Sequence, residues 1–343
     1  MAIKLKVKGN VLGIDIGTNT ISFALVKNDA KRSQILELDS IPTPKGAVNN
    51  GEIENFLAIG AEIKKYLTGC KYKYKSISMS IGSPQIIIRD FNINKVKKKE
   101  IEAAVIEDIS NTYKGVTDSH DISYKVTQED SNGINGIVAM CPKNIVEDYM
   151  KIAYEFGGNL KYIDVSANCI SKAVQTYVNT NIKTGNVIIV DIGVQKSIVN
   201  IISNGVLALS RQVPNGGIDL DKLIAKEFNI SYEEAEEKKK YGYKGDLEQS
   251  EIDLFIKSAF SGIEQEISRT MNFFVQNMSK QGIHKLMLIG GGCKIPGIDK
   301  YFQEIFKVPT ITLGHSDFVN VKMKKIEELS MYMSAIGAAI RED

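Results

Sequence analysis

The sequence has few cysteines, and their spacing fits neither a disulfide framework nor a zinc site. Cys70, Cys141, Cys169 and Cys293 are scattered along the chain and include no Cys-x-x-Cys pair. Such residues are by default reduced, mostly buried thiols in a reducing compartment.

Long apolar runs and a strong net charge are also absent. No run approaches the roughly 18 apolar residues of a membrane-spanning helix, and the lysine-rich residues 1–10 lack the apolar core of a signal peptide. The net charge of +2 argues against nucleic-acid binding through a broad basic field. We expect a cytoplasmic protein that binds no nucleic acid, makes no direct membrane insertion and reaches a membrane through protein partners.

The remaining composition is that of a globular protein with room for two cores. The 343 residues are 43% hydrophobic and 24% charged. Because single cores stop growing near about 250–300 residues, we expect two of them.

The chain is organised around the stretch Val11–Val26. An apolar run ends at Asp15, a glycine turn with two small polar residues follows, and a second apolar run completes a β-hairpin. Gly17 lets a phosphate approach the amides of the turn, and Asp15 suits a Mg²⁺ ion that keeps its water shell. The alternative is a plain hairpin whose aspartate caps the turn.

The same pattern recurs in the second half of the chain, over Val187–Ile202. Here Asp191 and Gly193 take the corresponding places, followed by Val194, Gln195 and Lys196. A duplicated domain with one such hairpin on each side of a cleft can hold the phosphates and metal of a nucleotide.

Two glycine clusters in the second half add to this pattern. Gly216 and Gly217 open a helix, and its N-terminal amides are expected to face a phosphate. A strand over Lys285–Ile289 runs into Gly290–Gly292, where three glycines allow a flat or charged ligand to touch the backbone.

Helix signals also flank these clusters. Ser231 and Glu234 form a capping box, and the helix they open carries Glu236 and Lys239 on one face, most simply as a surface pair. Alternating Lys and Tyr over Lys71–Lys75 favours a solvated strand edge over a platform for single-stranded nucleic acid. Apolar spacing predicts further helices over residues 52–67, 97–109, 143–156, 165–178, 249–280 and 325–340.

These motifs in this order resemble the actin and sugar-kinase ATPase superfamily and, within it, the PilM family of type IV pilus assembly proteins, which is itself similar to the cell-division protein FtsA. The resemblance covers essentially the whole chain. It also rests on residues 213–217 followed by 231–236, on the adenosine-type motif of residues 290–297, and on the closing stretch of residues 335–341.

The resemblance implies an α/β, actin-like (ribonuclease H-like) fold with two lobes around a nucleotide cleft and an FtsA-type small α+β subdomain inserted in the first lobe. The expected ranges are 1–81 and 163–184 for lobe I, 82–162 for the small subdomain, 185–324 for lobe II with its outer part at 228–284, and 325–343 for a closing helix.

The resemblance further implies ATP and Mg²⁺ in the cleft. Asp15 and Asp191 would position the metal through water. The residues expected around the nucleotide are Gly17, Thr18, Asn19, Gly193, Lys196, Gly216 and Gly217 at the phosphates, Glu236 and Lys239 at the ribose and base, and Gly290, Gly291, Gly292 and Lys294 at the adenosine. The implied partner is the cytoplasmic N-terminal peptide of a PilN-like membrane protein. Pilus motor ATPase components and a second copy of the chain are further candidate partners.

Two departures from the superfamily pattern bear on catalysis. Residues 194–196 replace a further glycine and threonine, so that Lys196 is either a phosphate-binding cation or a solvated lysine. Ser166 stands where relatives often have a glutamate that orients the attacking water. We therefore expect an ATP binder with slow ATPase activity at most. The alternatives are an FtsA-like filament-forming division protein and a small-molecule kinase of the same fold.

Overall fold

A first five-stranded sheet contains the first hairpin. The computed structural model describes residues 9–29, 33–70, 72–178, 185–240, 249–279, 281–314 and 326–340. The strand order is β10-β6-β1-β2-β3. The consecutive strands β1, β2 and β3 form an antiparallel meander, and β6 and then β10 pair in parallel on the other side of β1. The strands are β1 (Gly9–Ile16), β2 (Thr20–Asn28), β3 (Ser33–Pro42), β6 (Ser76–Ile81) and β10 (Leu160–Val165).

A second five-stranded sheet repeats this topology around the second hairpin. Its order is β13-β12-β11-β14-β15, again an antiparallel meander with two parallel strands beside its first strand. The strands are β11 (Asn186–Ile192), β12 (Ser197–Ser203), β13 (Val206–Val213), β14 (Lys285–Ile289) and β15 (Thr310–Thr312). Both predicted hairpins and the predicted duplication are therefore confirmed.

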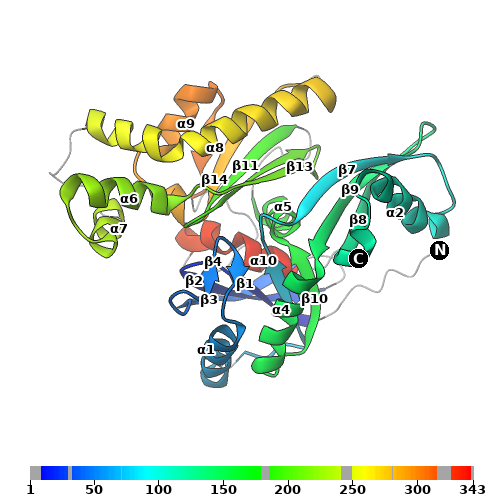
Figure 1. Cartoon of the computed structure of the whole chain (residues 1–343), viewed down its shortest axis with the longest axis horizontal. Coiled ribbons are helices and arrows are strands. Elements are labelled where there is room, and N and C mark those ends of the chain that lie inside the picture. The colour runs from blue at the N-terminus through cyan, green and yellow to red at the C-terminus, as the bar shows by residue number, and fades with distance from the viewer. Residues whose placement is uncertain are drawn as a thin grey trace.

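The two sheets are joined through helices that lie between them (Figure 1). The helices α5 (Ser166–Tyr177) and α10 (Met333–Ala339) share one core with β1, β2 and β11. Val11 faces this shared core while Leu12 faces the outer core of the first sheet, and Val187 and Ile188 alternate in the same way on β11. The continuous apolar runs of both hairpins thus reflect strands buried on both faces.

Each sheet has its own outer layer of helices. The first sheet packs on α1 (Phe56–Gly69) and α4 (Lys143–Glu155), whereas the second packs on α6 (Gly217–Phe228), α8 (Gln249–Asn277) and α9 (Ile298–Phe306). The helix α7 (Tyr232–Lys240) follows α6 and packs against it. None of the helices in the described ranges is long and apolar enough to cross a membrane.

A separate three-stranded sheet lies beside these layers, on the right in Figure 1. Its strands β7 (Ile87–Ile93), β9 (Ile134–Pro142) and β8 (His120–Glu129) pair in that order, and α2 (Ile101–Thr112) and α3 (Val116–Ser119) enclose a small core with them. The range expected for the small subdomain, 82–162, also includes α4 and the first half of β10, which pack with the first sheet. The domain boundaries stay a prediction.

Three local expectations differ from the structure. The helix expected over 52–67 begins at Phe56, because Glu52–Ile53 (β5) pairs with Val48–Asn49 (β4) and Asn55 caps the helix by accepting a 3.0 Å hydrogen bond from the Ala58 amide. The strand edge expected at Lys71–Lys75 is wrong for residues 72–75, which form no strand; Lys71 lies outside the described residues.

The closing helix starts as a 3-10 turn, η5 (Ile326–Tyr332), before α10. The residues expected at its start, Lys325, and in the closing motif, Arg341, lie outside the described ranges, as does Lys280 at the expected end of α8.

Candidate functional site

The turns of the two hairpins have the same backbone geometry. The amide of Gly17 donates to the Thr20 carbonyl at 2.9 Å, and the amide of Gly193 donates to the Lys196 carbonyl at 3.0 Å. These two amides therefore close their own turns, and the placement of Gly17 and Gly193 at the phosphates stays a prediction. Within the described part of the chain, the amides of Thr18 and Asn19 have no backbone partner, which leaves them available to an anion.

Asp15 and Asp191 occupy equivalent places near the ends of β1 and β11. Burial raises the pKa of Asp15, while a hydrogen bond from Ser80 and the charge of Lys196 act in the opposite direction. Burial and the charge of Asp15 raise the pKa of Asp191 to about 7, again opposed by Lys196. The two carboxylates therefore repel each other across the two lobes in a poorly hydrated place.

Lys196 reaches from the second hairpin into the first lobe. Its ammonium donates a short hydrogen bond to the carbonyl of Gly82, directly after β6. Burial lowers the pKa of Lys196 to about 8, against the attraction of Asp15 and Asp191. The alternative of a solvated lysine is therefore wrong, because the ammonium is bound to the first lobe through the Gly82 carbonyl.

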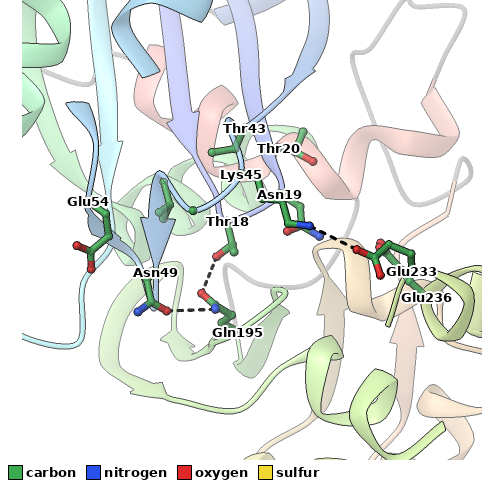
Figure 2. A pocket seen from close by; sticks show the side chains of 12 residues that line it. Thr18, Asn19, Thr20, Thr43, Lys45, Asn49, Glu54, Gln195, Glu233 and Glu236 are labelled. Atoms are coloured by element: carbon green, nitrogen blue, oxygen red, sulfur yellow. Dashed lines mark hydrogen bonds and ion pairs between the residues drawn. The ribbon is translucent and has the colours of Figure 1, made fainter. Parts of the chain in front are cut away.

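Gln195 brings the two turns into direct contact (Figure 2). Its side-chain oxygen accepts hydrogen bonds from the Thr18 hydroxyl at 3.2 Å and from the Asn50 amide at 2.7 Å. Its side-chain amide donates to Asn49 at 3.2 Å. Two of the three residues that depart from the superfamily pattern, Gln195 and Lys196, thus dock the second turn onto the first lobe.

A pocket of about 850 Å³ opens beside this contact, between the first turn and α7. We call it the cleft pocket; Figure 2 shows its side chains. Lys45 and Glu233 form a 3.5 Å ion pair at its edge. Its lining residues are Thr18, Asn19, Thr20, Thr43, Lys45, Gly46, Val48, Asn49, Glu54, Gln195, Glu233 and Glu236.

Of the residues predicted from sequence, the structure brings Thr18, Asn19 and Glu236 to the cleft pocket. The sequence did not predict the lining residues that lie between Thr43 and Glu54, or Glu233. The segment between β3 and α1 has glycine turns at Gly46 and Gly51, but its sequence is that of ordinary turns, and Glu233 reads as an ordinary residue of a capped helix.

The amides at the start of α6 support the second turn. The Gly217 amide donates to the Gly193 carbonyl and the Ile218 amide to the Val194 carbonyl, both at 2.9 Å. Asp219 accepts from the Gly216 amide at 3.0 Å. These amides are therefore engaged within the protein, unlike the free phosphate donors expected at this helix start.

Glu236 and Lys239 do not form the expected surface pair. Lys239 lies 2.7 Å from the carboxylate of Asp221 on α6 and donates to the Gly217 carbonyl at 3.2 Å. Both side chains of this ion pair are nearly buried, with 13% and 8% exposure. Lys239 therefore holds α7 against α6. Glu236, unlike Lys239, lines the cleft pocket.

The triple-glycine loop packs directly on Asp191. Gly290 has a φ of +81°, and a Cβ at this position would clash with the carboxylate of Asp191, so only glycine fits. A Cβ at Gly292 would clash with Ile192, whereas one at Gly291 would meet nothing. Gly291 and the exposed Lys294 thus form the open side of the loop.

The residues that the structure describes do not form a cluster that would hold Mg²⁺ directly through several protein ligands. Within the ranges that the structure describes, no group of three or more His, Cys, Asp or Glu residues is arranged to hold a metal. The positive charge of the Lys196 ammonium already favours the ionised forms of Asp15 and Asp191. A divalent cation between the carboxylates would therefore be repelled by that ammonium.

The chain matches known proteins over most of its length. The sequence model of the family described as type IV pilus assembly protein PilM matches residues 13–343. The cell division protein FtsA of Buchnera aphidicola subsp. Baizongia pistaciae (strain Bp) is 25% identical over 381 residues, which cover 94% of this chain and 88% of the relative.

Solved structures share the fold. A chain of a PilM-PilN type IV pilus biogenesis complex superposes with a TM-score of 0.81 at 20% identity, covering 97% of this chain and 98% of the other. MreB 5 of Spiroplasma citri bound to AMPPNP superposes with a TM-score of 0.54 at 18% identity, covering 96% and 94%. The expected two-lobed, actin-like ATPase fold is thereby confirmed.

Proposed function

The chain belongs to the PilM family of type IV pilus assembly proteins, and from this premise we propose that it is an ATP-binding scaffold of pilus assembly. The observation that carries the proposal is the cleft pocket, which is bordered by the first turn, by Gln195 of the second turn and by Glu236 of α7. Parts of both lobes thus line one space large enough for a nucleotide.

ATP is proposed to bind with its phosphates at the amides of Thr18 and Asn19 and near the Lys196 ammonium. Glu236 borders the ribose, and Gly291 and Lys294 lie on the adenosine side. The fold relative MreB 5 of Spiroplasma citri is bound to AMPPNP, which supports nucleotide binding as such. Gly216, Gly217 and Lys239 take a different part, because they hold the second turn and α7 in place.

Hydrolysis is proposed to be slow or absent. Ser166 stands at the start of α5, where its hydroxyl lies 2.8 Å from the hydroxyl of Ser80. A serine in such a pair is a far weaker base than a carboxylate, so that it does not orient and activate water as a glutamate does. ATP would then act by holding the two lobes together.

The proposed partner is the cytoplasmic N-terminal peptide of a PilN-like membrane protein. The fold relative at a TM-score of 0.81 is a PilM in complex with PilN, which supports this assignment. An extended peptide docked in a groove would place the scaffold at the cytoplasmic face of the membrane.

Nucleotide binding is tested by calorimetry with ATP. Glu236→Ala should weaken binding about two- to tenfold, the size of one or two lost hydrogen bonds. The matched control is Glu237→Ala, an exposed neighbour on α7 that should bind ATP like the wild type. Failure of the wild type to bind ATP would refute the nucleotide part of the proposal.

Partner binding is tested by capture on an immobilised PilN N-terminal peptide, with and without ATP. We expect specific capture that ATP strengthens, together with phosphate release near background. No capture in either condition would overturn the scaffold assignment. Rapid turnover lost on Asp191→Ala would show an ATPase instead.

The similarity to FtsA, at 25% identity, supports a second candidate function as a filament-forming protein. Sedimentation with ATP separates the two: filaments that form without the peptide would favour the FtsA-like role.

A further inference from the structure

The Lys196 side chain is aimed across the cleft by a rigid turn. The backbone carbonyl of Lys196 accepts a hydrogen bond from the Gly193 amide. The hydroxyl of the next residue, Ser197, donates to the Asn215 carbonyl at 2.7 Å. Gln195 fixes the other side of the turn by its bonds to the first lobe. Both neighbours of the lysine backbone are therefore held, and the side chain extends toward Gly82.

The ammonium lies in a seat that two glycines leave open. A Cβ on Gly51 would clash with the Lys196 nitrogen, and a Cβ on Gly82 would lie 3.1 Å from it. Gly82 also supplies the carbonyl that accepts from the ammonium.

The charges around this seat are those of a cation site. Asp15 pairs in register with Ser80 on β6, two residues before Gly82. Asp191 pairs with Ile198 on β12, two residues after Lys196. The positive charge of Lys196 acts to lower the pKa of both carboxyl groups. In an actin-like cleft the cation between such carboxylates and the phosphates is expected to be a bound metal. Here a positive charge is attached to the chain itself.

We propose that Lys196 replaces the divalent cation of this cleft, so that the protein binds a nucleoside triphosphate without Mg²⁺. The inference rests on the proposed nucleotide-binding function. A lysine ammonium has three donors. One is used by Gly82, and the others are available to the carboxylates and to a phosphate. Because lysine is a compact point charge, it binds phosphate without the geometry that a metal demands.

The test measures ATP affinity by calorimetry in EDTA and in excess Mg²⁺. We expect the wild type to bind about equally in both. Lys196→Met keeps the length of the side chain without its charge, and it should lose about tenfold or more in EDTA, the size of one charge-assisted hydrogen bond. In Mg²⁺ it should recover, because the metal can now enter between the carboxylates. Lys300→Met, an exposed lysine on α9, is the control and should match the wild type.

Direct metal binding gives a readout that needs no nucleotide. Mn²⁺ followed by electron paramagnetic resonance should bind Lys196→Met more tightly than the wild type. Wild-type ATP binding that is lost in EDTA and restored by Mg²⁺ would overturn the inference and leave the proposed function standing. Absence of ATP binding in both conditions would overturn both. If wild type and Lys196→Met had equal affinities for ATP and for Mn²⁺, the inference would also be overturned. This comparison requires only that the variant is folded, which circular dichroism checks.

Discussion

Replacing Asp191 by asparagine should stabilise the protein at neutral and alkaline pH. The carboxylate lies under the triple-glycine loop, where burial and the charge of Asp15 raise its pKa from 3.8 to about 7. Asparagine has nearly the same shape and carries no charge. Asp191→Asn therefore removes the cost of holding an ionised carboxylate in this place.

The size and the pH dependence of the effect follow from the pKa. The folded state holds the Asp191 proton more tightly than the unfolded chain, so this contribution to the free energy of unfolding falls as the pH rises from about 4 to about 7. At 1.36 kcal/mol per pKa unit, the variant should gain about 1.5 kcal/mol at pH 5 and about 4 kcal/mol at pH 8. Functional residues often carry such a cost.

The assay is chemical denaturation at both pH values, in the absence of nucleotide. Asp90→Asn is the control, because Asp90 is an exposed aspartate on β7 whose charge the solvent screens. The gain of Asp191→Asn should exceed that of the control and should grow with pH. A variant that is no more stable than the wild type at pH 8, or whose gain does not depend on pH, would refute the reasoning.

Two further predictions concern the core between the sheets. Lys172→Met should lower the free energy of unfolding by about 3 kcal/mol, because it removes the 2.8 Å ion pair between Asp164 and a lysine side chain that is only 6% exposed. The control is Lys65→Met, at an exposed lysine, which should change the denaturation midpoint little. An equal effect of the two substitutions would contradict the prediction. Gly337→Ala should cost about 1–3 kcal/mol or more, because its Cβ would clash with a backbone carbonyl of α5. Gly69→Ala on α1, where a Cβ meets nothing, should leave the thermal midpoint unchanged or raised, and similar losses at both sites would argue against the clash.

The sequence predicted those elements whose signal is local. The strand Lys285–Ile289 has the predicted bounds, and the helix α6 begins at the predicted glycine pair, because an apolar run ends at glycines in one case and glycines precede it in the other. The repeat of the hairpin also predicted the repeated sheet. Tertiary contacts overrode local pattern at residues 72–75, where Tyr72 lies with its hydroxyl 3.0 Å from that of Tyr66 on α1.

The site was less predictable, because its contacts join residues far apart in the chain. Glycine turns indicated where amides are exposed, but they could not indicate which amides another segment occupies. The start of α6 illustrates this: Gly217 has the pattern of a phosphate-binding helix start, yet its amide is taken by the Gly193 carbonyl. Likewise, Lys196 could not be assigned to solvent or to the cleft until Gly82 and Gly51 were placed around it.

The two hairpins of the repeat have diverged into different tasks. The first turn keeps the amides of Thr18 and Asn19 open toward the cleft pocket. The second turn is held from behind by α6 and reaches forward through Gln195 and Lys196 to the first lobe. What the sequence presents as a degenerate copy of a phosphate motif is therefore a set of contacts between the lobes. A ligand that enters this cleft lies next to those contacts. Its binding is therefore coupled to how the lobes are held together.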